Sequence, residues 1–148
     1  MGAPTKSTTS GPKRRPTKPS AMWLTKERLK NDGATFDVVE QRIPTTFITR
    51  DFLGFADIVA CTPSQGIVAI QVTSDGHSDK SKTGSNVGAR QTKIECEPRA
   101  VVWMKSGGRI EVWGWGRKGA RGTLKVDTLR RTRAFLGLED RIGWTEIE

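Results

Sequence analysis

The segment from Asp57 to Thr73 constrains the fold of this chain more than any other, because two apolar runs flank a turn-forming sequence. Residues 62–66 read Thr-Pro-Ser-Gln-Gly, which is typical of a tight reversal between two strands. A hairpin folded about Ser64 places Asp57 opposite Gln71, since both residues are equally far from Ser64. Thr73 shares their face because strand side chains alternate. The sequence therefore predicts a polar cluster on an otherwise apolar strand pair.

This arrangement resembles the pattern of the PD-(D/E)xK nuclease superfamily. In that family, an Asp near the start of one strand is followed, after a hairpin, by Glu or sometimes Gln, one apolar residue and Lys. The corresponding positions of this chain hold Asp57, Gln71, Val72 and Thr73. The surrounding residues, roughly 22 to 116, look most like archaeal-type Holliday junction resolvases and similar small phage proteins. The match departs at Thr73, which replaces the Lys.

The resemblance implies a divalent metal site for Mg²⁺ or Mn²⁺. Asp57 would coordinate the ion, with the amide oxygen of Gln71 and the backbone carbonyl of Val72 as further ligands. Two structural alternatives remain: Asp57 caps the turn at Gly54, or the Gln71 amide bridges backbone groups inside the sheet. Because Gln71 is neutral, we expect weaker metal binding than a Glu would give.

Thr73 cannot supply the positive charge that the family's Lys provides, so another residue must. Lys93 and Arg90 share one face of a helix that we expect to begin after Asn86 and to pack over the strand of Gln71. Lys80 and Lys82, in a polar loop spanning residues 74–85, compete for this role. The alternative is that these charges are solvated, or contact phosphates only.

The family often takes a further carboxylate from its first helix or strand. Glu40, expected within a strand beside the hairpin, is the first candidate and Glu27 the second. Asp51 is expected at the rim. His77 is the single histidine and lies in the polar loop, where a solvent-exposed role is favoured over general-base chemistry.

The formal net charge of +9 favours a polyanionic partner, and nucleic acid is favoured over lipid because no apolar run approaches membrane-spanning length. Five of the positive charges lie in residues 1–20, which contain no acid. We expect these residues to form a disordered basic arm that contacts phosphates, or merely a solubilising tail. They lack the apolar run of a signal peptide, so a cytoplasmic location is expected, in the host if the chain is phage-encoded.

The fold expected is α/β, a single domain with a central mixed β-sheet flanked by helices, as in the restriction-endonuclease-like core. Residues 21–130 would form this nuclease-like domain and residues 131–148 a basic C-terminal extension. Helices are expected over residues 21–32 and from Asn86 to Lys105, with Pro98 kinking the second or opening a further turn. Strands are expected for residues 109–116 and 122–127, and a basic helix for residues 129–138.

Trp113 and Trp115 alternate along one expected strand and point to the same face. They either stack bases beside a basic turn or pack in the core or a dimer contact, and the second interpretation is favoured. The turn itself supplies candidate DNA contacts: Arg117, Lys118 and Arg121. Cys61 and Cys96 have no metal-ligand spacing and are expected to be buried thiols.

Together these features predict a metal-dependent DNA endonuclease, selective for branched DNA and acting in DNA recombination. Two symmetric cuts in a four-way junction require a two-fold homodimer. One alternative is a nuclease-fold protein that binds nucleic acid without cleaving it, since Gln71 and Thr73 replace charged residues. A third interpretation is a phage structural or host-takeover interaction protein, favoured only if the chain fails to retard DNA in a gel at modest salt.

Overall fold

A computed structural model describes residue 2, residues 18–75 and residues 86–148. The helices are α1 (Ala21–Asn31), α2 (Val87–Glu95), α3 (Pro98–Lys105) and a 3-10 turn, η1 (Leu138–Asp140). The strands are β1 (Thr35–Val38), β2 (Gln41–Arg42), β3 (Thr49–Arg50), β4 (Ile58–Thr62), β5 (Gly66–Ser74), β6 (Arg109–Lys118), β7 (Val126–Leu136) and β8 (Ile142–Ile147).

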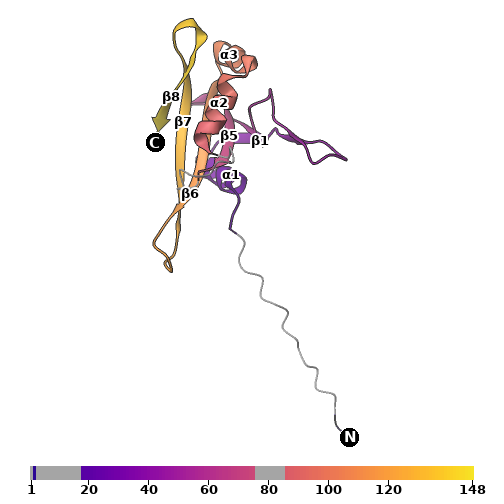
Figure 1. Cartoon of the computed structure of the whole chain (residues 1–148), viewed down its shortest axis with the longest axis vertical. Coiled ribbons are helices and arrows are strands. Elements are labelled where there is room, and N and C mark those ends of the chain that lie inside the picture. The colour runs from indigo at the N-terminus through magenta and orange to yellow at the C-terminus, as the bar shows by residue number, and fades with distance from the viewer. Residues whose placement is uncertain (1, 3–17, 76–85) are drawn as a thin grey trace.

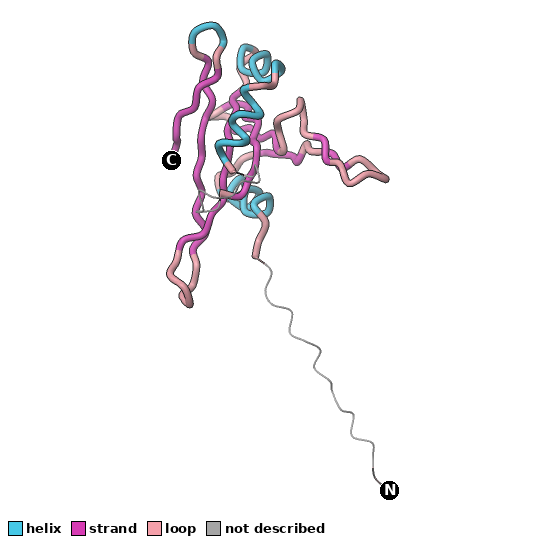
Figure 2. Tube along the Cα trace, viewed as in Figure 1, coloured by secondary structure: helices cyan, strands magenta, loops and turns pink. Residues whose placement is uncertain are grey.

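One mixed sheet organises the described residues, with the strand order β1-β4-β5-β6-β7-β8. β5 and β6 run parallel, and the other neighbouring pairs run antiparallel. The parallel pair needs a long crossover, which α2 and α3 provide. Figure 1 shows these helices lying against the sheet, and Figure 2 separates helices, strands and loops along the trace. The expected α/β class with a central mixed sheet is confirmed.

The hairpin of β4 and β5 forms in the predicted register. Ile58 pairs with Ile70 and Thr62 with Gly66, which closes the turn with a φ of 75°. A positive φ is accessible to glycine at little cost. The register places Asp57, one residue before β4, opposite Gln71.

α1 covers one face of the sheet. The Ser20 hydroxyl accepts the Trp23 N–H at its start, and Gly33, with a φ of 72°, follows its C-cap at Asp32. Leu29 is buried against apolar residues on the same face of the sheet. These residues are Ile58, Ala60, Ile70, Val72 and Trp113.

α2 and α3 cover the opposite face. The Asn86 side chain caps α2 by accepting the Ala89 N–H, and Pro98 occupies the first turn of α3, where its missing N–H costs nothing. The buried residues of this layer are Phe55, Ala56, Ala69, Val87, Ile94, Ala100, Ile110, Val112 and Ala134. At Gly114 on β6, a Cβ would lie 2.5 Å from Val87 Cγ2, so the close approach of α2 requires glycine there.

The helix predicted for residues 129–138 is wrong, because β7 runs without interruption from Val126 to Leu136. Thr132 and Ala134 are buried towards the α2 layer, whereas Arg131 and Arg133 reach the buried carboxylate of Glu111 on β6. Strand alternation therefore explains the basic residues better than helical spacing. The strand expected at 122–127 begins only at Val126, and the boundary expected between residues 130 and 131 falls inside β7.

Both cysteines, Cys61 and Cys96, are exposed rather than buried, so that expectation is wrong. Trp113 is 2% exposed and packs beneath α1, which confirms the core interpretation for that indole. Trp115 lies on the same face, is partly buried, and donates its Nε1–H to Thr25 Oγ1 at 2.8 Å.

Candidate metal centre

A pocket of about 520 Å³ lies where the start of β4, the middle of β5 and α2 come together. Twelve residues line it, and they include most of the polar side chains of this region. They are Ala21, Met22, Glu40, Thr49, Asp51, Asp57, Gln71, Val72, Thr73, Ser74, Arg90 and Lys93.

Asp57 lies at the base of this pocket and is 5% exposed. Its Oδ2 accepts the Nε2–H of Gln71 at 2.5 Å and the backbone N–H of Val72 at 2.8 Å. These partners show that Asp57 does not cap the turn at Gly54. Its Oδ1 accepts no hydrogen bond from the described residues, so that oxygen is available to a ligand.

The carboxylates of Glu40, Asp51 and Asp57 gather in the pocket, each offering an oxygen within 4.8 Å of the others. Such a set of oxygen donors fits a hard divalent cation. Glu40 was expected within a strand, and that expectation is wrong. It lies in the connection between β1 and β2. The backbone N–H groups of Val39 and Glu40 both donate to the Asp57 carbonyl, at 2.9 and 3.3 Å, which fixes this connection beside Asp57.

Asp51 was expected at the rim, yet its side chain is only 14% exposed and belongs to the cluster. The small hairpin of β2 and β3 explains this position, because Gln41 pairs with Arg50. Glu40 directly precedes β2 and Asp51 directly follows β3, at the end of the hairpin away from its turn. The hairpin therefore brings the two residues together. The turn-forming sequence around Pro44 was the available signal, but the strands are only two residues long.

Burial raises the pKa of the Asp57 carboxyl to about 7. The neighbouring carboxylates of Asp51 and Glu40 act in the same direction as burial, the Val72 N–H and the charge of Arg90 oppose it, and the pKa of about 7 is the net result. Three carboxylates this close repel one another when ionised, so the cluster favours either a proton or a cation.

The predicted basic residues of α2 also line the pocket. The Lys93 ammonium forms an ion pair with the Asp51 carboxylate. Arg90 lies one turn earlier, and its Nε is buried with no hydrogen-bond partner among the described residues. Thr73 is 4% exposed, and its hydroxyl donates to the Ser74 carbonyl at 3.2 Å. The expected packing of α2 over the strand of Gln71 is confirmed, because Arg90 and Lys93 line the same pocket as Gln71.

Gln71 is 2% exposed, and its amide is oriented by the bond from Nε2 to Asp57. Its Oε1 is buried and has no hydrogen-bond partner among the described residues. An unpaired buried carbonyl oxygen is costly, so a ligand or a water that reached it would stabilise the site. Val72 contributes the N–H already described, and the metal-ligand role of its carbonyl stays a prediction.

The remaining predicted residues lie elsewhere. Glu27 pairs with Lys30 on α1, and Arg117 pairs with Asp127 at 3.0 Å. Lys118 and Arg121 are exposed near the connection of β6 and β7 and do not line the pocket. His77, Lys80 and Lys82 lie outside the described residues, as does most of the basic arm.

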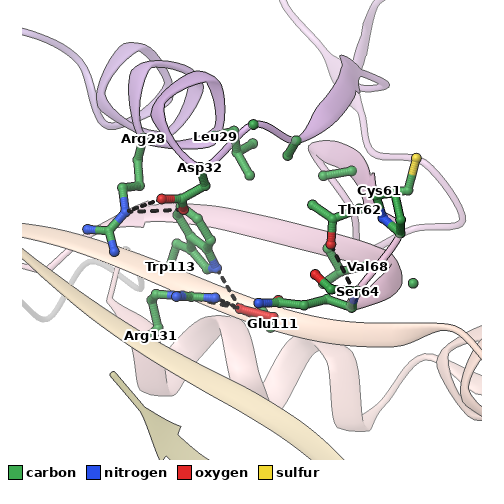
Figure 3. A pocket seen from close by; sticks show the side chains of 16 residues that line it. Arg28, Leu29, Asp32, Cys61, Thr62, Ser64, Val68, Glu111, Trp113 and Arg131 are labelled. Atoms are coloured by element: carbon green, nitrogen blue, oxygen red, sulfur yellow. Dashed lines mark hydrogen bonds and ion pairs between the residues drawn. The ribbon is translucent and has the colours of Figure 1, made fainter.

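A second pocket, of about 460 Å³, lies on the α1 side of the sheet (Figure 3). Its most buried charge is Glu111, whose Oε1 accepts from Trp113 Nε1 at 3.0 Å and from Arg131 at 2.8 Å. Arg133 contacts Oε2 at 3.4 Å, and the Arg131 guanidinium lies 4.6 Å from the Trp113 ring centroid. Both oxygens of Glu111 are therefore occupied, and this network stabilises β6 and β7 rather than presenting a reactive group.

Comparison of the chain with protein-family models, with curated proteins and with solved structures gave no match. Among the helices of the described ranges, none is long and apolar enough to cross a membrane.

Proposed function

We propose that this protein is a metal-dependent endonuclease that hydrolyses phosphodiester bonds of DNA and prefers branched DNA such as a four-way junction. The observation that carries the proposal is the meeting of Glu40, Asp51 and Asp57 within 4.8 Å, in a pocket that Arg90 and Lys93 also line. Carboxylates beside cations can hold a divalent metal and a phosphate in the same space.

The donor set fits Mg²⁺ or Mn²⁺, because all available ligands are oxygens. A divalent cation held by these carboxylates would favour the ionised form of Asp57, whose pKa is raised, and Gln71 Oε1 is a further oxygen without a partner that could serve as a ligand. When bound, such an ion polarises a phosphate and lowers the pKa of a water molecule.

The protein's own residues have separate roles in this proposal. Gln71 and the Val72 N–H orient Asp57 by binding one of its oxygens, which leaves Oδ1 for the ion. Lys93 takes the role of the family's missing lysine, because Thr73 carries no charge. If Asp51 were engaged with a bound cation, the Lys93 ammonium would be released to contact a phosphate oxygen and stabilise the negative charge that develops there.

The chain topology supports the finer assignment to a restriction-endonuclease-like core. α1 precedes three antiparallel strands, β1, β4 and β5, and the crossover through α2 and α3 leads to the parallel strand β6. This is the order that the resemblance implies. In this proposal, Asp57, one residue before β4, and Gln71, within β5, correspond to the family's acidic pair.

The test is cleavage of a labelled four-way junction and of a matched linear duplex with Mg²⁺ or Mn²⁺. Wild type should cut the junction in preference to the duplex, and Asp57→Asn should remove detectable cleavage while keeping the shape of the side chain. Asp127→Asn is the matched control, since Asp127 pairs with Arg117 and does not line the pocket. Equal cleavage by wild type and Asp57→Asn would exclude Asp57 from the reaction.

A second candidate is a nuclease-fold protein that binds DNA without cutting it. Thr73 favours it, because its hydroxyl is bound to the Ser74 carbonyl, and so does Lys93, because its charge is paired with Asp51. Salt-sensitive retardation of DNA without cleavage in either metal would support this candidate. The proposed two-fold dimer predicts a mass in solution of twice the 16.3 kDa chain.

A further inference from the structure

The hairpin of β2 and β3 projects from the body of the protein (Figures 1 and 2). Its tip carries exposed apolar residues. Phe47 at this tip is 97% exposed, and Ile48 and Ile43 are 60% and 40% exposed. Single exposed apolar residues are ordinary, but three within one turn form a surface that gains from a partner.

The tip is a defined turn. The Ile43 N–H donates to the Ile48 carbonyl at 3.0 Å, and the Thr46 N–H and hydroxyl both donate to the Ile43 carbonyl. Thr45 adopts a φ of 68°, which a non-glycine residue seldom takes outside a tight turn. These contacts hold the hairpin closed up to its tip and leave Phe47 pointing away from any described residue that could bury it.

A groove at this hairpin adjoins the candidate metal centre, and Ile43 and Ile48 line it while Phe47 lies outside it. A pocket of about 420 Å³ is lined by Ile43 and Ile48 from the hairpin, and it shares Thr49, Asp51 and Lys93 with the metal pocket. Its wall also contains Arg50 and Arg99, the latter paired with Glu97. A ligand lying along this groove would meet cations first and then apolar side chains.

We propose that the Phe47 tip inserts beside an unstacked base of DNA whose backbone runs along this groove, so that the hairpin recognises interrupted base pairing. A strand of nucleic acid has the required pattern, since its phosphates match the cations and its bases match an aromatic side chain. Glu40 and Asp51 bracket the hairpin in the chain, which couples the wedge directly to the carboxylate cluster.

The wedge deepens the proposed nuclease function, on which it rests for its substrate. Apolar side chains inserted between base steps unstack them, and the cost is lower where pairing is already broken. A junction or mismatch therefore binds in preference to intact duplex. The choice of branched DNA is made at Phe47, and cleavage is carried out at the metal centre.

The experiment measures binding without cleavage, in the absence of divalent metal. A four-way junction and a matched linear duplex each carry the fluorescent adenine analogue 2-aminopurine, at the branch point and at the corresponding duplex position. Phe47→Ala is compared with the aromatic replacement Phe47→Trp and with Leu138→Ala, a change at a 90% exposed apolar residue of η1. Because Phe47 buries almost no surface, its variants should fold as wild type does.

Wild type should raise the 2-aminopurine fluorescence of the junction by unstacking the labelled base, and Phe47→Ala should abolish this rise. Phe47→Ala should also weaken junction binding about tenfold, as loss of one stacked base predicts. Duplex binding should be unchanged, and Phe47→Trp and Leu138→Ala should behave as wild type. Wild-type affinity and fluorescence in Phe47→Ala would overturn the wedge. A Phe47→Ala protein whose mass in solution differs from that of wild type, but whose 2-aminopurine fluorescence does not, would also overturn the wedge. That result would place the tip between two copies of the chain.

These results separate the wedge from the nuclease proposal. A wild-type protein that raises the fluorescence but never cuts DNA with Mg²⁺ supports the wedge and contradicts the nuclease. A wild-type protein that cuts junctions no better than Phe47→Ala does, with equal binding, contradicts the wedge and leaves the nuclease intact.

Discussion

The side-chain amide of Gln71 donates a 2.5 Å hydrogen bond to Oδ2 of Asp57, the same oxygen that accepts the Val72 N–H. This bond fixes which end of the amide faces the carboxylate and turns Oε1 into a buried, unpartnered position among the described residues. The pair is thus arranged for a neutral residue at position 71. A glutamate there could donate no hydrogen to an ionised Asp57.

Gln71→Glu should weaken the fold and strengthen metal binding. Without metal, the added buried carboxylate loses the hydrogen bond and repels Asp57, which should cost about 1–3 kcal/mol of unfolding free energy. With Mn²⁺, the extra charge should tighten binding. Urea unfolding and calorimetric titration measure the two effects. Gln65→Glu, at an exposed position of the β4–β5 turn, is the control and should change neither.

Lys93→Gln should reduce cleavage more than it reduces metal affinity. The charge that stabilises the developing phosphate anion is lost, and such losses commonly lower kcat by about 10²–10³. Metal binding should hold or improve, because Asp51 is released from its ion pair. Lys105→Gln, which breaks an exposed pair with Asp140 outside the pocket, should be neutral. A fall in Mn²⁺ affinity equal to the fall in rate would assign Lys93 to the metal site instead.

The stability of the metal-free protein should fall as the pH rises from about 4 to about 7. The folded protein raises the pKa of Asp57 from the ordinary aspartate value of 3.8 to about 7, so between these values the folded state holds a proton that the unfolded state has lost. Protonation of Asp57 therefore favours folding. The free energy of unfolding should be lower above pH 7 than below pH 4 by up to about 4 kcal/mol.

Asp57→Asn should remove this pH dependence, because asparagine does not titrate. Its side-chain oxygen can still accept hydrogen bonds from Gln71 and Val72, so the local structure should be kept. Urea midpoints of both proteins between pH 4 and 8 provide the measurement. Mg²⁺ should restore stability to wild type above pH 7 and leave the variant unchanged. Parallel pH curves for the two proteins would mean that Asp57 is ionised throughout this range.

Glu111→Gln should destabilise the protein by about 3 kcal/mol, because it leaves the charges of Arg131 and Arg133 without their buried partner. Glu146→Gln, which loses an exposed pair with Arg130, should cost under about 1 kcal/mol. Denaturant unfolding separates the two. Cleavage by folded Glu111→Gln protein should be unchanged, since Glu111 does not line the metal pocket; a selective loss of activity would instead give the second pocket a role.

The parts of this fold that sequence could predict are those fixed by neighbouring residues. The β4–β5 hairpin followed from a turn sequence between apolar runs, and α2 and α3 followed from Asn86 and Pro98. The structure at residues 129–138 did not follow, because Arg131 and Arg133 have the charge of a solvated helix. Their partner is Glu111, a buried residue on another strand.

The residues of the candidate site likewise differ in whether local sequence or long-range packing brings them together. Asp57 and Gln71 are joined by one local hairpin, so counting residues from the turn was enough to bring them together. Asp51 entered the cluster through the β2–β3 hairpin, whose two short strands leave little alternation to recognise. The ion pair of Asp51 with Lys93 depends on the packing of α2 across the sheet, which no local pattern encodes.

The anomalous scattering of a crystal soaked in Mn²⁺ tests the metal centre most directly. We predict one strong peak bounded by the carboxylate oxygens of Glu40, Asp51 and Asp57, with the Lys93 ammonium moved away from Asp51. The peak should be absent from an Asp57→Asn crystal treated in the same way. An empty pocket in the wild-type crystal, with Lys93 still paired to Asp51, would contradict the account.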